Sequence, residues 1–172
     1  MSAGAGIRPP ATPPGLIVRE ATPDDNDSLI ALELQSPVLI GDVEEFFDRS
    51  PDAFASHRVQ GEHRVVLGEL DGSVVGVMAG VIQEPVVQGR PHRLVYIHRA
   101  RVDPAFHHRG VAWALSSDLF AWGRIQGAEG SYYLIAPEYE RSIAFGYPES
   151  EQSRHLGAPR TPLAELVHEE RW

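Results

Sequence analysis

The chain has 172 residues and a formal charge of −9, from 15 basic and 24 acidic residues. This length is typical of one domain, and so acidic a chain is not expected to bind nucleic acid. All the basic residues are arginine and cysteine is absent, which excludes a Walker-type P-loop, a lysine Schiff base, a cysteine nucleophile and disulfides.

Residues 1–15 are rich in proline and glycine, and we expect them to form a flexible leader. This leader has neither a basic start nor a long apolar stretch, so it does not read as a secretory signal. The chain also has no run of about 18 apolar residues, so no membrane span is expected. A cytoplasmic location is the default expectation.

A regular pattern begins after the leader. Thr22-Pro23-Asp24-Asp25 predicts a helix start, because threonine can cap, proline suits the first position, and the carboxylates favour the positive end of the helix dipole. The elements expected in this part are a strand at 16–20, a helix from there to about residue 35, a short helix at 42–48 and a helical turn from 50 towards 58.

The middle of the chain changes to the period of strands. The β-rich segments 64–70 and 74–87 are separated by Asp71-Gly72, a strong hairpin signal. A third strand is expected at 94–102, where alternation puts Tyr96 and His98 on one face and Arg99 and Arg101 on the other. These segments predict a three-strand meander.

A helix is expected from Gly110 to about residue 126, because apolar residues recur on one stripe and Gly127 can end it. The stripe consists of Val111, Leu115, Leu119 and Trp122. A strand at 131–136 and a short helix at 137–145 follow, and no pattern is clear beyond residue 147. This order predicts an α/β (α+β) fold with a mixed sheet.

The segment from Arg99 to Leu115 has the features of an anion site. It joins a strand to a helix, where unpaired N–H groups and the helix dipole favour a phosphate, and Gly110 and Ala112 leave room for close approach. Positive charge gathers here in an otherwise acidic chain. These features indicate a phosphate-bearing ligand, although a strand, a basic turn and a helix also occur as plain structure.

Residues 16–147 resemble the GCN5-related N-acetyltransferases. The most specific match is His107-His108-Arg109-Gly110-Val111-Ala112, which aligns with the family's pyrophosphate loop Arg/Gln-x-x-Gly-x-Gly/Ala and follows Val102-Asp103-Pro104. His107 stands where arginine or glutamine is usual. In the later helix, Tyr139 takes the place of an asparagine, and Gly146, followed by Tyr147, takes that of a tyrosine.

The resemblance implies a mostly antiparallel sheet flanked by helices, with acetyl-CoA held at the strand–loop–helix junction. It implies direct transfer of the acetyl group to a small-molecule or peptide amine. The residues expected to bind acyl-CoA are Arg101, Val102, His107, His108, Arg109, Gly110, Val111 and Ala112.

Acetyl transfer needs a base, donors for the thioester oxygen and an acid. We assign the base to His98, with Glu84 and a water relay as rivals, and the donors to backbone N–H groups near Arg101 and Val102. Tyr139 and Tyr147 are the candidate acids. A hydrogen-bonded strand histidine is the plainer interpretation of His98.

A metal site is not expected, because the eight histidines lack a ligand spacing. A second hypothesis is a catalytically weak or inactive acyl-CoA-binding or regulatory module, one half of a tandem or dimeric protein of this family. Residues 148–172 would then complete the sheet or form a homodimer, because an open strand edge invites pairing.

Overall fold

The computed structural model describes residues 10–40, 43–87, 89–132, 154–155 and 168–171. Within these residues the main sheet has seven strands in the order β1-β4-β5-β8-β9-β11-β10, and only β8 and β9 run parallel. The strands are β1 (Ile17–Glu20), β4 (His63–Leu70), β5 (Ser73–Gln83), β8 (Leu94–Val102), β9 (Gly130–Tyr132), β10 (Arg154–His155) and β11 (His168–Arg171). The expected mixed, mostly antiparallel sheet is confirmed.

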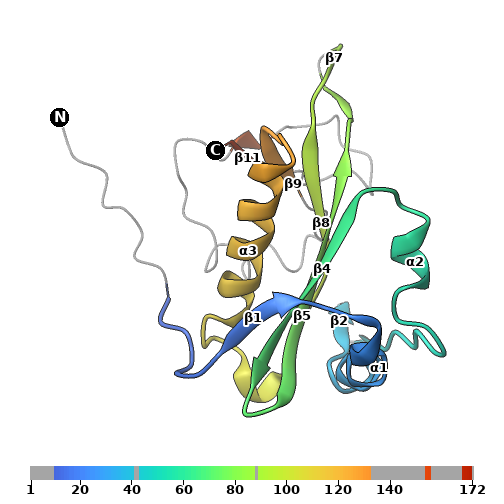
Figure 1. The fold of residues 1–172 in the computed structure, drawn as a ribbon, viewed down its shortest axis with the longest axis vertical. Coiled ribbons are helices and arrows are strands. Elements are labelled where there is room, and N and C mark those ends of the chain that lie inside the picture. The colour runs from blue at the N-terminus through green and yellow to red at the C-terminus, as the bar shows by residue number, and fades with distance from the viewer. Residues whose placement is uncertain (1–9, 41–42, 88, 133–153, 156–167, 172) are drawn as a thin grey trace.

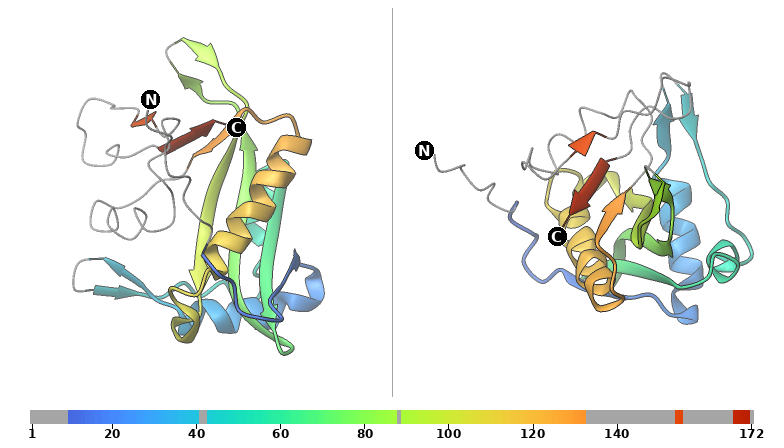
Figure 2. Two further views of the ribbon diagram at one scale, coloured as in Figure 1. Left: turned by 90° about the vertical axis from the view of Figure 1, so that its left-hand side faces the viewer. Right: turned by 90° about the horizontal axis from the view of Figure 1, so that it is seen from above.

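Two helices lie on opposite faces of this sheet, α1 (Asn26–Gln35) on one and α3 (Val111–Ile125) on the other (Figures 1 and 2). Side chains alternate along β4 and pack on both faces of the sheet. Val66 packs with α3, whereas Val65 and Leu67 pack with α1. Helix α3 lies close to the sheet at Gly76, where an added Cβ would be 2.9 Å from Val111.

The helix start predicted at Thr22 is confirmed. A 3-10 turn, η1 (Pro23–Asp25), leads into α1, and the Asp25 carboxylate accepts a hydrogen bond from the Thr22 N–H at 2.7 Å. Arg19 of β1 donates to the same carboxylate at 2.8 and 2.9 Å. These contacts tie the first strand to the first helix and hold the pKa of Asp25 well below its ordinary value.

The face predicted for Arg99 and Arg101 is wrong, because β8 has a bulge near its end. Val77 and Ala79 of β5 are two residues apart, whereas their partners on β8, Arg101 and His98, are three apart. The extra residue puts Arg101 on the same face as His98. Arg99 has a φ of 55°, and its side chain is hydrogen-bonded to α1 on that same side. The bulge therefore directs three side chains to one side.

The helix predicted over residues 42–48 is wrong for residues 43–48. A small separate hairpin is formed by β2 (Val38–Ile40) and β3 (Val43–Glu45), and β3 is exposed. β-Branched residues favour strands, and this preference outweighs the helical interpretation of the acidic run. The helical turn expected towards residue 58 is confirmed as α2 (Ala55–Arg58).

The ends of the other predicted elements also differ from the structure. The strand expected at 74–87 ends with β5 at Gln83, and β6 (Val86–Val87) pairs with β7 (Arg90–Pro91) in a short hairpin. Of the strand expected at 131–136, β9 contains the described part, and the helix expected at 137–145 lies outside the described residues. From the C-terminal segment, β11 pairs with β9.

Candidate active site

The segment between β8 and α3 makes a sharp turn into the helix. A 3-10 turn, η2 (Pro104–Phe106), follows β8, and Asp103 Oδ1 accepts a hydrogen bond from the Ala105 N–H at 2.8 Å. His108 and Gly110 have positive φ angles of 59° and 75°, a conformation that is strained for most residues but not for glycine. The helix predicted from Gly110 begins one residue later, at Val111, with Gly110 as its N-cap.

Backbone N–H groups at the start of α3 are available to a ligand. Among the described residues, no hydrogen bond uses the N–H groups of Arg109, Gly110, Val111 or Ala112. A helix N-terminus carries partial positive charge from such groups. This corner of the molecule therefore has the donor set that a phosphate requires.

The backbone of the leader runs beside this corner. A Cβ built on Gly110 would lie 2.8 Å from the Ala11 carbonyl oxygen and 3.4 Å from that of Pro10. Both the positive φ and the close approach therefore disfavour a side chain at position 110.

The loop side chains predicted to bind the cofactor have protein contacts of their own. The His107 ring donates from Nε2 to the Val102 carbonyl at 2.9 Å, which ties the loop to the end of β8. The Arg109 guanidinium lies 5.7 Å from the ring of Phe106. His108 and Ala112 are exposed, whereas Val111 is buried, so only its backbone can meet a ligand.

Arg101 lies at the other end of the predicted binding set. It donates to the Ala100 carbonyl at 2.7 Å, and its guanidinium lies 5.1 Å from the ring of Phe47. Val102 is half-buried and packs against the cluster under α3. The structure therefore brings Arg101 and Val102 to the end of β8 from which the loop begins.

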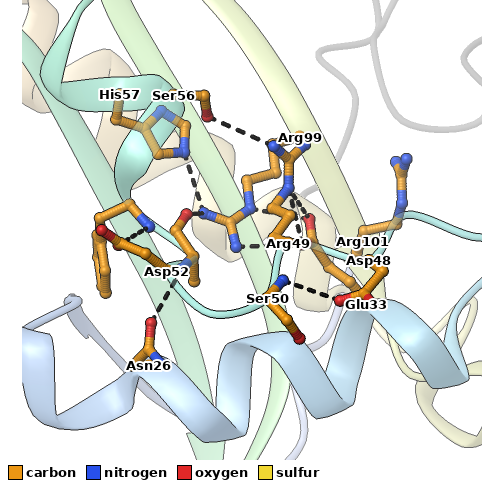
Figure 3. A network of polar contacts seen from close by, with 12 residues as sticks. Asn26, Glu33, Asp48, Arg49, Ser50, Asp52, Ser56, His57, Arg99 and Arg101 are labelled. Carbon is orange, nitrogen blue, oxygen red and sulfur yellow. Dashed lines mark hydrogen bonds and ion pairs between the residues drawn. The ribbon is translucent and has the colours of Figure 1, made fainter.

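A buried charge cluster lies beneath the bulge of β8, where two arginines share one carboxylate (Figure 3). Glu33 of α1 accepts from Arg99 Nε at 2.8 Å and from Arg49 Nε at 2.8 Å, and the side chains of Glu33 and Arg99 are fully buried. Arg99 also donates to the Ala53 carbonyl at 2.8 Å and to His57 Nε2 at 3.0 Å. This network fixes the loop after residue 48 and α2 against the bulge.

Five aromatic rings form a continuous row on the same face of the sheet. Neighbouring ring centroids are 5.1 to 5.8 Å apart. The row consists of His63, His57, His98, Tyr96 and Tyr132. The strand register explains part of it, because Val81 pairs with both His63 and Tyr96, and Tyr96 pairs with Tyr132.

His98 lies in the middle of this row and is uncharged at neutral pH. Burial, followed by the charges of Arg49 and Arg99, lowers its pKa to about 4. Burial and Arg99 lower the pKa of His57 to about 3. The rival base Glu84 is exposed and paired with Arg93 at 3.1 Å. Tyr139 and Tyr147 lie outside the described residues.

Comparison with known proteins decides the family. Residues 27–145 match the model of the acetyltransferase (GNAT) family. The chain belongs to this family. The strand–loop–helix junction and the bulged strand described above are thus parts of a GNAT acetyltransferase domain.

Solved structures of GNAT proteins share the fold. The PaiA N-acetyltransferase of Thermoplasma acidophilum, in complex with coenzyme A, aligns with a TM-score of 0.66 at 10% identity, covering 91% of this chain and 99% of that chain. The GNAT family N-acetyltransferase YhbS of Escherichia coli, in complex with CoA, aligns with a TM-score of 0.62 at 20% identity, covering 91% and 81%. No curated protein matches the chain.

Sequence reasoning missed several residues of this GNAT site. Glu33, Arg49 and His57 come from segments far from β8 and meet it only in the fold. One signal was available for Glu33, which lies four residues after the buried Leu29 and therefore on the buried stripe of α1. A charge at such a position needs a buried partner.

The described residues contain neither a group of metal-binding side chains nor a membrane-spanning helix. No three histidine, aspartate or glutamate side chains in this part of the chain lie close enough together to hold a metal ion. No helix among these residues combines the length and the apolar character that crossing a membrane requires.

Proposed function

We propose that the protein is an N-acetyltransferase that transfers an acetyl group from acetyl-CoA to an amine within a ternary complex. One observation carries the proposal: at the start of α3, four successive N–H groups have no hydrogen bond among the described residues, in a chain of the GNAT family. Acetyl-CoA supplies the activated acetyl group, and the chain supplies binding, orientation and proton transfer.

The N–H groups of Arg109 to Ala112 would hold the cofactor diphosphate. The glycine at 110 fits this role, because its positive φ and the absence of a Cβ let the backbone approach a ligand closely. Arg101, His107, His108 and Arg109 would add positive or hydrogen-bonding side chains around it. Backbone N–H groups near Arg101 and Val102 would polarise the thioester carbonyl.

His98 is the described residue that we assign to the amine side of the site. A neutral ring is able to accept a proton, but transfer from an ammonium with a pKa of about 10 to a ring with a pKa of about 4 is uphill by about 8 kcal/mol. This difference in pKa makes His98 a poor direct base. It favours a water relay beside His98 as the route by which the proton leaves the amine. Tyr139 and Tyr147 remain the proposed acids for the departing thiolate.

The acceptor in this proposal is a small-molecule or peptide amine, and the protein acts in the cytoplasm as a homodimer. Light scattering tests the dimer, and a mass of about one chain would contradict it. The second hypothesis, a catalytically weak acyl-CoA-binding module, is favoured by one observation: the low pKa of His98 makes it a poor base.

Two measurements test the function. Isothermal titration of the full chain with acetyl-CoA should show binding, and a Gly110→Glu variant should lose it, because the carboxylate adds bulk and negative charge at the diphosphate site. Turnover with a panel of amines can be followed with a thiol reagent, since the chain has no cysteine to react with it. No binding by the parent protein removes the proposal, and binding without turnover on any amine supports the module.

A further inference from the structure

The contact between Arg99 and His57 fixes where the proton of His57 lies. The distance from Arg99 Nη1 to His57 Nε2 is 3.0 Å, and a guanidinium only donates hydrogen bonds. His57 Nε2 must therefore accept, and the proton of the neutral ring is on Nδ1. Figure 3 shows the ring held against Arg99 above the loop that carries Arg49.

The Nδ1–H group of His57 has no acceptor among the described residues, although His57 is completely buried. Leaving a buried donor without a partner destabilises the folded protein, so a partner is expected. The adjacent ring of His98, with its centroid 5.2 Å away and tilted by 46°, has a buried Nε2 that also lacks a partner in this part of the chain. Two buried nitrogens without partners thus occur in contacting rings.

His63 is the other ring next to His57, but its arrangement is different. The two rings are stacked at 5.8 Å with an interplanar angle of 25°, so an N–H in the plane of one ring does not point at the edge of the other. His63 Nδ1 donates to the Gly61 carbonyl at 2.8 Å, and no nitrogen of His63 is among the buried atoms of the described residues that lack a partner. His98 is therefore the better acceptor for His57.

We propose that His57 is a positioning residue, which donates its Nδ1–H through one bridging water to Nε2 of His98, and so holds the proton of the neutral His98 ring on Nδ1. This assignment satisfies both nitrogens at once. With the opposite tautomer of His98, the bridging water would accept from both rings and could donate to neither.

A consequence for the proposed transferase follows, and this step rests on that proposed function. With Nε2 turned inward, His98 presents an N–H to the amine side of the site, and this group donates a hydrogen bond to an oxygen of water or substrate. It does not accept the proton of an ammonium. The contacts from Glu33 through Arg99 to His57 thus determine that His98 donates a hydrogen bond. None of these three residues touches the substrate in this proposal.

Nitrogen NMR of the histidine rings tests the proposal on the full chain at neutral pH, with the signals of His98 and His57 assigned from His98→Gln and His57→Gln. We expect the proton on Nδ1 in both rings. A His98 ring with its proton on Nε2 would overturn the proposal. Because no cofactor or turnover enters this measurement, the tautomer and the transferase function succeed or fail separately.

Two variants of His57 separate positioning from packing. His57→Asn places an amide N–H near the original Nδ1 and should keep the proton of His98 on Nδ1. His57→Gln places its amide near the original Nε2, keeps an acceptor for Arg99, and should release the His98 proton to Nε2. The positioning role of His57 is contradicted if a folded His57→Gln protein still has the His98 proton on Nδ1. It is also contradicted if a folded His57→Asn protein has that proton on Nε2.

Discussion

Glu33 is the single carboxylate that allows two arginines to lie beneath the bulge of β8. Arg99 is fully buried with it, and Arg49 is three-quarters buried. An ion pair taken out of water adds little net stability, but removing one partner leaves an uncompensated buried charge. The cluster is therefore best seen as a fixed support for the bulge and for His57.

The charge of Glu33 is expected to be essential for folding stability. Glu33→Gln keeps the shape and removes the charge, and we expect the free energy of unfolding to fall by about 3–5 kcal/mol, because two arginines then face a neutral amide. Urea unfolding measures this change. The control is Glu84→Gln, which breaks the exposed pair with Arg93 and should leave the free energy nearly unchanged. Equal effects of the two variants would contradict this account.

The two buried histidines give a second prediction, on acid stability. In the folded protein the pKa values of His57 and His98 are about 3 and about 4, below the 6.5 of an unperturbed histidine. Between these values the unfolded chain binds more protons, so stability is complete above pH 6.5 and falls as the pH drops towards 4. His57→Gln should remove about half of this slope in urea titrations at a series of pH values. An unchanged slope would show that His57 is protonated in the folded protein.

At the scale of the element, the sequence determines β8 and α3 closely but not the bulge within β8. The predicted strand 94–102 has the same bounds in the structure, and the stripe from Val111 to Leu119 is buried. A period-two pattern has no signal for an inserted residue, so alternation put Arg99 and Arg101 on the wrong face. The positive φ of Arg99 depends on its contact with Glu33, 66 residues away.

The two ends of α3 offer a matched pair of glycines. Gly110 and Gly127 both have a φ of 75°, but a Cβ would meet Ala11 at the first and nothing within 4 Å at the second. Gly127→Ala should cost about 1–2 kcal/mol of stability from backbone strain, and Gly110→Ala more, because its Cβ would also meet the Ala11 carbonyl. Only Gly110→Ala should also weaken acetyl-CoA binding, by about tenfold or more. Calorimetry distinguishes the two variants, and equal affinities would remove Gly110 from the binding site.

At the scale of the whole molecule, local patterns predicted the layered α/β order and the position of the phosphate loop. They did not predict the cluster of Glu33, Arg49, Arg99 and His57, because its members come from α1, a loop, β8 and α2, and only the packing of these elements brings them together. The pairing of β11 with β9 was likewise not predicted, because the sequence beyond residue 147 has no clear strand pattern.

Residues 10 and 11 lie beside the candidate cofactor site, which gives a last prediction. The carbonyl oxygens of Pro10 and Ala11 lie beside Gly110, so a ligand on this loop competes with these two residues for space. A chain that lacks residues 1–11 keeps the hydrogen bond from the Leu16 N–H to the Pro13 carbonyl. It should bind acetyl-CoA several-fold more tightly, because residues 10 and 11 no longer occupy space beside Gly110 in any of the molecules. Titration calorimetry of both lengths measures this, and Gly110→Glu in the shortened chain is the control that should still fail to bind. Weaker binding by the shortened chain would instead make the leader part of the cofactor site.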